Sequence, residues 1–160
     1  MEKALNLPKS IKMVITDFDG IITDNCVYID SKGEMSRKIN FKDIMAFSLL
    51  RKNGFKIGII SGEANSAIDL LAKKFNIEEV HQGIRNKLEV LEGIVKKYNL
   101  NKDEIIYIGD DVNDYDSLCY VDYPFTVPSA VKKVKTIPNI QITRKDSGDG
   151  AFREIVDNLI

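Results

Sequence analysis

The chain has 160 residues, which fits one domain long enough to bury a core and support an enzyme by itself. Its 23 Lys and Arg against 24 Asp and Glu give a formal net charge of −1, which excludes an overall field for attracting nucleic acid or an anionic membrane. Two cysteines are too few for a disulfide framework, no apolar run approaches the roughly 20 residues that span a bilayer, and residues 1–10 lack the pattern of a signal peptide, so we expect a cytoplasmic protein that binds neither nucleic acid nor membrane.

The first half of the chain alternates between short apolar runs and stretches of helical period. Residues 12–16 form a β-branched apolar run that ends at Asp17, and residues 55–60 form another, so both are predicted to be buried strands. Residues 26–41 break the alternation, because two short strand-like pieces flank turn-forming residues at positions 30–33. We predict a β-hairpin there that projects near the carboxyl end of the first strand.

The helices between these runs and the C-terminal part set the class of fold. Helical period predicts helices over residues 43–52, 64–75 and 86–98, and residues 105–108 read as a further buried strand. The C-terminal part carries a short strand at 140–143, a glycine-bearing loop at 147–150 and a last helix. This alternation predicts an α/β fold with a parallel central sheet flanked by helices, in a single domain over residues 1–160.

Polar side chains follow three of the predicted strands, at the point where each strand ends. Asp17, Asp19 and Gly20 follow the first strand, Ser61-Gly62 follow the strand at 55–60, and residues 109–114, Gly-Asp-Asp-Val-Asn-Asp, follow the strand at 105–108. Ligands of open parallel sheets bind outside the carboxyl ends of the strands. We therefore expect these groups to form one site.

The chemistry of these groups points to phosphoryl transfer. Packed carboxylates repel one another, and a Mg²⁺ ion held by Asp17 and Asp110 would remove that penalty. Lys87 and the hydroxyl and amide of Ser61 would hold the transferring phosphoryl group. Asp17 would be the nucleophile that forms an aspartyl-phosphate, and Asp19 would protonate the leaving alcohol and then activate water.

Each of these signals has an ordinary structural reading when it is taken alone. An Asp-x-Asp pair is common on protein surfaces, and Asp110 and Asp111 could cap a helix and favour its dipole. Lys87, Glu63 and Lys74 could be solvated helix residues. The order of the whole set along the chain favours the catalytic reading.

The set resembles the motifs of the haloacid dehalogenase superfamily in order and spacing. Within it, the chain looks like the small capless branch of 3-deoxy-D-manno-octulosonate 8-phosphate phosphatases and nonulosonate (KDN) 9-phosphate phosphatases. The features shared with the branch are the hairpin with Gly33, residues 40–43, Gln82-Gly83 before Asn86-Lys87, and the tail at 148–154.

The resemblance implies a Rossmann-like fold without a cap domain and a role for each matching residue. Asp17 becomes nucleophile and metal ligand, Asp19 acid/base and ligand through its backbone carbonyl, and Asp110 the third protein ligand. Ser61, with Gly62 beside it, and Lys87 hold the phosphoryl group, and Asp111 and Asp114 support the metal water and the lysine. The branch also implies a homotetramer with the hairpins packed at its centre.

The prediction of the substrate depends on residues that follow Ser61-Gly62. Glu63 stands where octulosonate enzymes typically have arginine, and Glu63 with Lys74 looks more like the nonulosonate enzymes. The arginine that relatives supply across the subunit interface falls on Leu71, which leaves Lys73, Lys74 and Arg153 as candidates for binding a sugar carboxylate.

The leading hypothesis is a Mg²⁺-dependent phosphatase acting on the terminal phosphate of a 3-deoxy 2-keto sugar acid of eight or nine carbons. One alternative is a broader phosphatase of small sugar phosphates. Another is a phosphoaspartate receiver or a noncatalytic module. Asp19 argues against a receiver, because a receiver needs no acid/base two residues beyond its phosphoacceptor.

Overall fold

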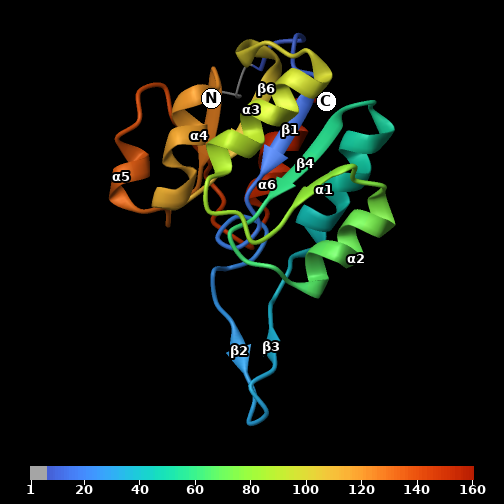
Figure 1. Ribbon diagram of the computed structural model, residues 1–160, viewed down its shortest axis with the longest axis vertical. Coiled ribbons are helices and arrows are strands. Elements are labelled where there is room, and N and C mark those ends of the chain that lie inside the picture. The colour runs from blue at the N-terminus through green and yellow to red at the C-terminus, as the bar shows by residue number, and fades with distance from the viewer. Residues whose placement is uncertain (1–6) are drawn as a thin grey trace.

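The computed structural model describes residues 7–160. Residues 1–6, part of the segment in which the sequence predicts no signal peptide, lie outside the described residues. The central sheet has six strands in the order β5-β4-β1-β6-β7-β8, all paired in parallel, which confirms the predicted α/β fold (Figure 1). These strands are β1 (Met13–Thr16), β4 (Lys56–Ile60), β5 (Glu79–His81), β6 (Ile105–Ile108), β7 (Tyr123–Thr126) and β8 (Gln141–Ile142).

Helices cover both faces of the sheet, which explains why its central strands consist of apolar residues. Every residue of β1 and β6 is buried. Helix α1 packs against α2 and α6 on one face, and α3 packs against α4 on the other, in front of the sheet in Figure 1. The helices are α1 (Phe41–Lys52), α2 (Ser66–Phe75), α3 (Lys87–Tyr98), α4 (Tyr115–Tyr120), α5 (Lys132–Lys135) and α6 (Ala151–Asp157), with 3₁₀ turns η1 (Lys102–Glu104) and η2 (Val112–Asp114). Among the described residues, no helix is long and apolar enough to cross a membrane.

The predicted hairpin is present between β1 and α1. Strands β2 (Tyr28–Ile29) and β3 (Met35–Ser36) pair antiparallel and project beyond the end of the sheet toward which β1 and β4 point (Figure 1). Gly33 has a φ of +80° in the connecting turn, a conformation that glycine adopts at little cost. An antiparallel bridge between Thr23 and Ile39 closes the base of the hairpin, which therefore stands beside the carboxyl ends of the strands.

Candidate active site

A pocket of about 600 Å³ lies at the carboxyl edge of the sheet, in the size range of small-molecule sites. Its walls come from the loops after β1, β4, β5 and β6, which the sheet pairing brings together. The backbone N–H of Asp17 donates to Ile108 and that of Ser61 donates to His81, so each loop begins in register with its neighbour. The lining residues include Asp17, Asp19, Ser61, Gly62, Glu63, Ile84, Arg85, Asp110 and Asp111.

Lys87 links two buried carboxylates at the floor of this pocket. Its Nζ lies 2.9 Å from Asp17 Oδ2 and 2.8 Å from Asp114 Oδ1. Burial and the Asp114 charge raise the pKa of Asp17 well above its usual value, and Lys87 opposes that rise. Burial alone would lower the pKa of Lys87, but the Asp17 and Asp114 carboxylates outweigh it and raise that pKa. The lysine therefore stays a cation beside Asp17.

Asp114 also organises the loop that carries Asp110. Its Oδ1 accepts from the Tyr107 hydroxyl at 2.8 Å, and its Oδ2 accepts from the backbone N–H groups of Asp110 and Asp111 at 3.2 and 3.4 Å. Asp111 caps η2 by accepting from the N–H of Val112 at 2.6 Å. Asp111 thus caps the turn that contains Asp114, and its support of a metal-bound water stays a prediction. The contact with Lys87 makes Asp114 a second anchor for the lysine.

Three carboxylates at this edge fit a divalent cation. Oxygens of Asp17, Asp110 and Asp114 all lie within 4.8 Å of one another. Burial, followed by the charges of Asp114 and Asp111, raises the pKa of Asp110 to about 7, which is the effect expected of packed acids without a counterion. A Cβ on Gly20, which has a φ of +88°, would lie 2.1 Å from Asp110 Oδ2, so only glycine lets that carboxylate approach the loop after β1. Oxygen donors of this kind suit Mg²⁺.

Asp19 is held by a residue that the sequence did not single out. Arg37, at the base of the hairpin, donates through Nε to Asp19 Oδ1 at 2.8 Å, and its side chain is only 9% exposed. The Thr23 hydroxyl donates to the same oxygen at 3.0 Å. Both contacts fix one oxygen of Asp19 and leave Oδ2 for the pocket that the residue lines.

Ser61 stands at the opposite side of the floor. Its side chain is buried, and its hydroxyl donates to the Glu63 carbonyl at 2.7 Å while accepting from the Glu63 N–H at 3.2 Å. This local turn directs the exposed Glu63 toward the pocket that it lines. A Cβ on Gly62 would meet Asn113 Nδ2 at 3.1 Å, so glycine permits close approach of this loop to the one after β6.

Comparison with known proteins decides the family. Residues 60–155, more than half of the chain, match the family described as haloacid dehalogenase-like hydrolase. The chain belongs to the haloacid dehalogenase-like hydrolases. It is a phosphatase that resembles the 3-deoxy-D-manno-octulosonate 8-phosphate phosphatases.

Three relatives of this hydrolase are informative. The 3-deoxy-D-manno-octulosonate 8-phosphate phosphatase of Escherichia coli K12 is 26% identical over 153 residues, covering 95% of this chain and 80% of the relative. The enzyme of that name from Moraxella catarrhalis, solved with a magnesium ion, a phosphate ion and KDO, is 29% identical with a TM-score of 0.89, covering 94% of this chain and 86% of that one. A hydrolase of the same family from Streptomyces avermitilis is 34% identical with a TM-score of 0.88, covering 96% and 88%.

Not every predicted residue of this hydrolase reaches the pocket. Lys74 lies in the last turn of α2, with its Nζ 5.5 Å from the centre of the Phe75 ring, and it does not line the pocket. Leu71 is 3% exposed and packs in the core, so it offers nothing to a ligand. The pocket instead contains Arg85, which the sequence does not single out because a lone arginine in a loop belongs to no recognisable pattern.

The C-terminal loop of the hydrolase lies against the loop after β1. Gly148 donates its N–H to the Ile21 carbonyl at 3.0 Å, and a Cβ there would lie 2.5 Å from the backbone N of Asp24. The buried Asp43 accepts from the N–H of Gly150 at 3.0 Å and from that of Arg153 at 3.0 Å. Burial raises the pKa of Asp43, and these backbone donors oppose the rise. Of the glycines predicted to form this loop, Gly148 therefore serves close packing, whereas Gly150 has a φ of +94° at the start of α6.

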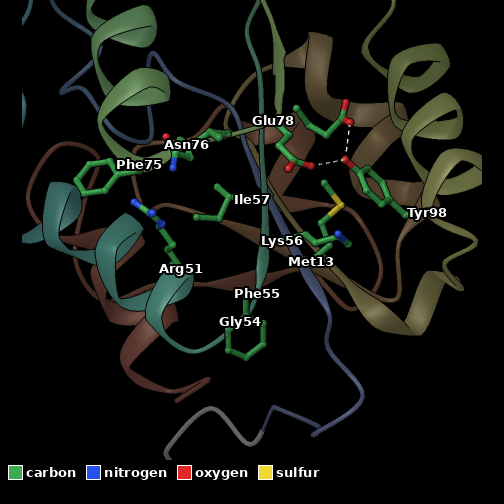
Figure 2. A pocket seen from close by; sticks show the side chains of 12 residues that line it. Met13, Arg51, Gly54, Phe55, Lys56, Ile57, Phe75, Asn76, Glu78 and Tyr98 are labelled. Atoms are coloured by element: carbon green, nitrogen blue, oxygen red, sulfur yellow. Dashed lines mark hydrogen bonds between the residues drawn. The ribbon is translucent and has the colours of Figure 1, made fainter.

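A second pocket, of about 210 Å³, lies at the other edge of the sheet, where β4 and β5 begin (Figure 2). Arg51 and Lys56 line it together with Glu78, Glu79 and Tyr98. The Tyr98 hydroxyl donates to Glu79 at 2.8 Å and to Glu78 at 3.2 Å. Parallel sheets place ligand sites at the carboxyl ends of the strands, so this edge is not the candidate active site of the hydrolase.

Proposed function

We propose that this hydrolase removes the terminal phosphate of a 3-deoxy 2-keto sugar acid of eight or nine carbons, and that residues 1–160 act as one catalytic domain. The observation that carries the proposal is that Asp17, Asp19 and Asp110 line one pocket, with Lys87 buried against Asp17 beneath its floor, in a chain that resembles octulosonate 8-phosphate phosphatases. The relative solved with KDO supports a sugar acid as the organic part of the substrate.

Asp17 and Asp19 divide the reaction between them. An Asp17 carboxylate oxygen forms a bond to phosphorus as the bond from phosphorus to the ester oxygen breaks, and Asp19 Oδ2 gives its proton to the departing alkoxide. The product at this stage is an aspartyl-phosphate on Asp17. Asp19 then takes a proton from water, whose oxygen attacks phosphorus and returns Asp17 as a carboxylate.

The surrounding groups stabilise charge during both steps. Asp17, Asp110 and the backbone carbonyl of Asp19 would hold Mg²⁺, which when bound neutralises the packed acids and shares the charge of the phosphoryl oxygens. Lys87 adds a fixed positive charge beside Asp17, since Asp114 and Asp17 both hold its Nζ. Ser61 places a hydroxyl on the other side of the phosphoryl group, whereas its backbone N–H, which the sequence predicts to share this role, is already donated to the His81 carbonyl.

Two measurements test the chemistry. Purified protein should release phosphate from an aryl phosphate with Mg²⁺ and lose that activity in chelator, and unchanged activity in chelator would rule out the metal mechanism. Asp17→Asn should lower turnover by roughly 10⁴-fold or more without changing the thermal midpoint by more than a few degrees, because it removes the nucleophile. Near-normal turnover of Asp17→Asn would assign the nucleophile elsewhere.

The substrate needs a separate experiment. We expect octulosonate 8-phosphate and nonulosonate 9-phosphates to be hydrolysed faster than hexose phosphates. Glu63 at the pocket favours the nonulosonates, because its carboxylate can accept hydrogen bonds from sugar hydroxyls or an amine. Equal rates across the panel would support the broader sugar phosphatase instead.

We also propose assembly of four copies through the hairpins. Tyr28, Ile29 and Met35 are 66%, 64% and 55% exposed on the projecting strands, an apolar surface that soluble proteins usually cover. The same assembly would give Lys74, which is remote from the pocket of its own copy, a neighbouring pocket to reach. Sedimentation should report a tetramer for the wild type and smaller species for Ile29→Lys, and a monomeric wild type would discard the assembly.

A further inference from the structure

Arg85 occupies the wall of the active-site pocket in the loop between β5 and α3. The loop is fixed to the floor, because the N–H of the preceding Ile84 donates to the Ser61 carbonyl at 3.0 Å. Two residues later the chain enters α3 at Lys87, whose side chain is buried beside Asp17. The backbone of Arg85 is thus tied to the catalytic centre at both ends, while its side chain is exposed at the pocket.

The charges around Arg85 indicate what kind of group its exposed side chain can bind. The lining residues include the four acids Asp17, Asp19, Asp110 and Asp111 together with Glu63, and Arg85 is the one arginine or lysine among them. Lys87 lies beneath the floor with its Nζ bound to two carboxylates. Within residues 7–160, the Arg85 guanidinium has no carboxylate at ion-pair distance, unlike Arg37 and Arg153. An unpaired guanidinium in an acidic pocket is a binding group for an anion.

The position of that anion differs from the position of the transferring phosphoryl group. The phosphoryl group must meet Asp17, which is 5% exposed at the floor beside Lys87. Arg85 stands at the exposed wall with Glu63, where the remainder of a bound ester extends toward solvent. A guanidinium at that place meets the organic part of the substrate, and planar carboxylates match its donors in pairs.

We propose that Arg85 binds the carboxylate of the sugar-acid substrate and selects acidic over neutral sugar phosphates. This inference rests on the proposed function and adds a specificity residue to it, since neither Leu71 nor Lys74 lines the pocket. Arg85 donates two N–H groups to the carboxylate, and Glu63, which lines the same pocket, accepts from hydroxyls of the same sugar.

The test compares two phosphate esters that differ only in the carboxylate, 6-phosphogluconate and glucitol 6-phosphate, with octulosonate 8-phosphate alongside. For the wild type we expect kcat/KM to favour the acid over the neutral ester. Arg85→Gln should lower kcat/KM for both acids roughly 10- to 100-fold more than for glucitol 6-phosphate, mainly by raising KM. A loss of this size is expected when one charge-assisted hydrogen-bonding contact is removed. The preference of Arg85→Lys for the acids should lie between those of the wild type and Arg85→Gln, because lysine keeps the positive charge and loses the paired donors.

Arg51→Gln is the matched control, since Arg51 is an exposed arginine at the other pocket and its loss changes net charge equally. It should leave the ratio between acid and neutral ester unchanged. If Arg85→Gln slows both esters by the same factor, Arg85 binds the phosphoryl group or only shapes the loop, and the inference is overturned while the proposed function stands. If the wild type turns over no sugar-acid phosphate, the proposed function fails and the inference fails with it.

Discussion

At the scale of the residue, the site depends on how each carboxylate is held. Asp17 and Asp19 are two positions apart, yet Lys87 approaches the first and Arg37 the second. Lys87 comes from the start of α3 and Arg37 from the base of the hairpin. Different cations, on separate elements, therefore orient the nucleophile and the acid/base.

Arg37→Met should separate these two roles. Without the Nε contact, Asp19 keeps only the Thr23 hydroxyl and is no longer fixed for proton transfer. General acid catalysis matters most for a poor leaving group, so turnover of an alkyl phosphate should fall about 10-fold or more, and turnover of p-nitrophenyl phosphate much less.

Lys38→Met is the control for Arg37→Met, because Lys38 lies beside Arg37 but pairs with Asp24 at 3.1 Å and is largely exposed. We expect it to change neither rate by more than about twofold, as is usual for an exposed ion pair. An equal loss on both esters in Arg37→Met would show that Arg37 shapes the pocket without acting through Asp19.

The sequence could predict the catalytic carboxylates but not the residues that hold them. Asp17, Asp19 and Asp110 follow strands directly, so the end of an apolar run locates them. Arg37 and Arg85 lie in loops, where no periodicity relates position to direction. The place of each side chain depends on the packing of distant segments, which a single sequence does not encode as a local pattern.

At the scale of the element, prediction succeeded where burial imposed a pattern. Strands β1, β4 and β6 are short β-branched runs because helices cover both sides of them. Strand β7 was not predicted, since Pro124 within it is unusual for a strand with neighbours on both sides. The short helices α4 and α5 were also missed, because each offers too few turns to display a period.

Asp43 joins two elements that are far apart in sequence, and its removal should separate them. Its carboxylate, in the first turn of α1, accepts from N–H groups at the start of α6. Asp43→Ala would leave those buried donors without a partner and should lower the free energy of unfolding by about 2 kcal/mol, measured in urea.

Asp157→Ala is the control for Asp43→Ala, because it removes a half-exposed carboxylate whose partner, Arg153, lies on the same helix. We expect it to cost no more than about 0.5 kcal/mol. Equal effects of the two substitutions would mean that Asp43 contributes no more than a surface ion pair.

At the scale of the whole molecule, the two edges of the sheet hold buried carboxyl groups whose pKa values shift in opposite directions. At the carboxyl edge, burial and neighbouring acids raise the pKa of Asp17 and of Asp110, so their charge opposes folding until a cation binds. At the amino edge, Glu79 is surrounded by donors from β5 and α3. Function and stability are therefore placed at opposite ends of the strands.

Glu79 should make the protein sensitive to acid. Burial raises the pKa of Glu79, but hydrogen bonds from Lys97, His81 and Tyr98 outweigh burial and lower it from 4.5 to about 2. A carboxyl group with a lower pKa in the folded state stabilises the fold fully above its unfolded pKa, and that stabilisation is lost as pH falls from about 4.5 through about 2. The loss should be on the order of 2–3 kcal/mol, since one pKa unit corresponds to about 1.4 kcal/mol and Lys97 is partly screened by solvent.

Glu79→Gln isolates this effect from the acids of the active site. The difference in unfolding free energy between wild type and Glu79→Gln should be larger at pH 6 than at pH 2.5, because Glu79 is protonated in the unfolded state at pH 2.5 and most of the stabilisation from its ionised form is then lost. Glu78→Gln, next to it and exposed, should show no such dependence, although Glu78 accepts from the same Tyr98 hydroxyl at 3.2 Å. A difference for Glu79→Gln that stays constant with pH would assign acid sensitivity to other carboxylates.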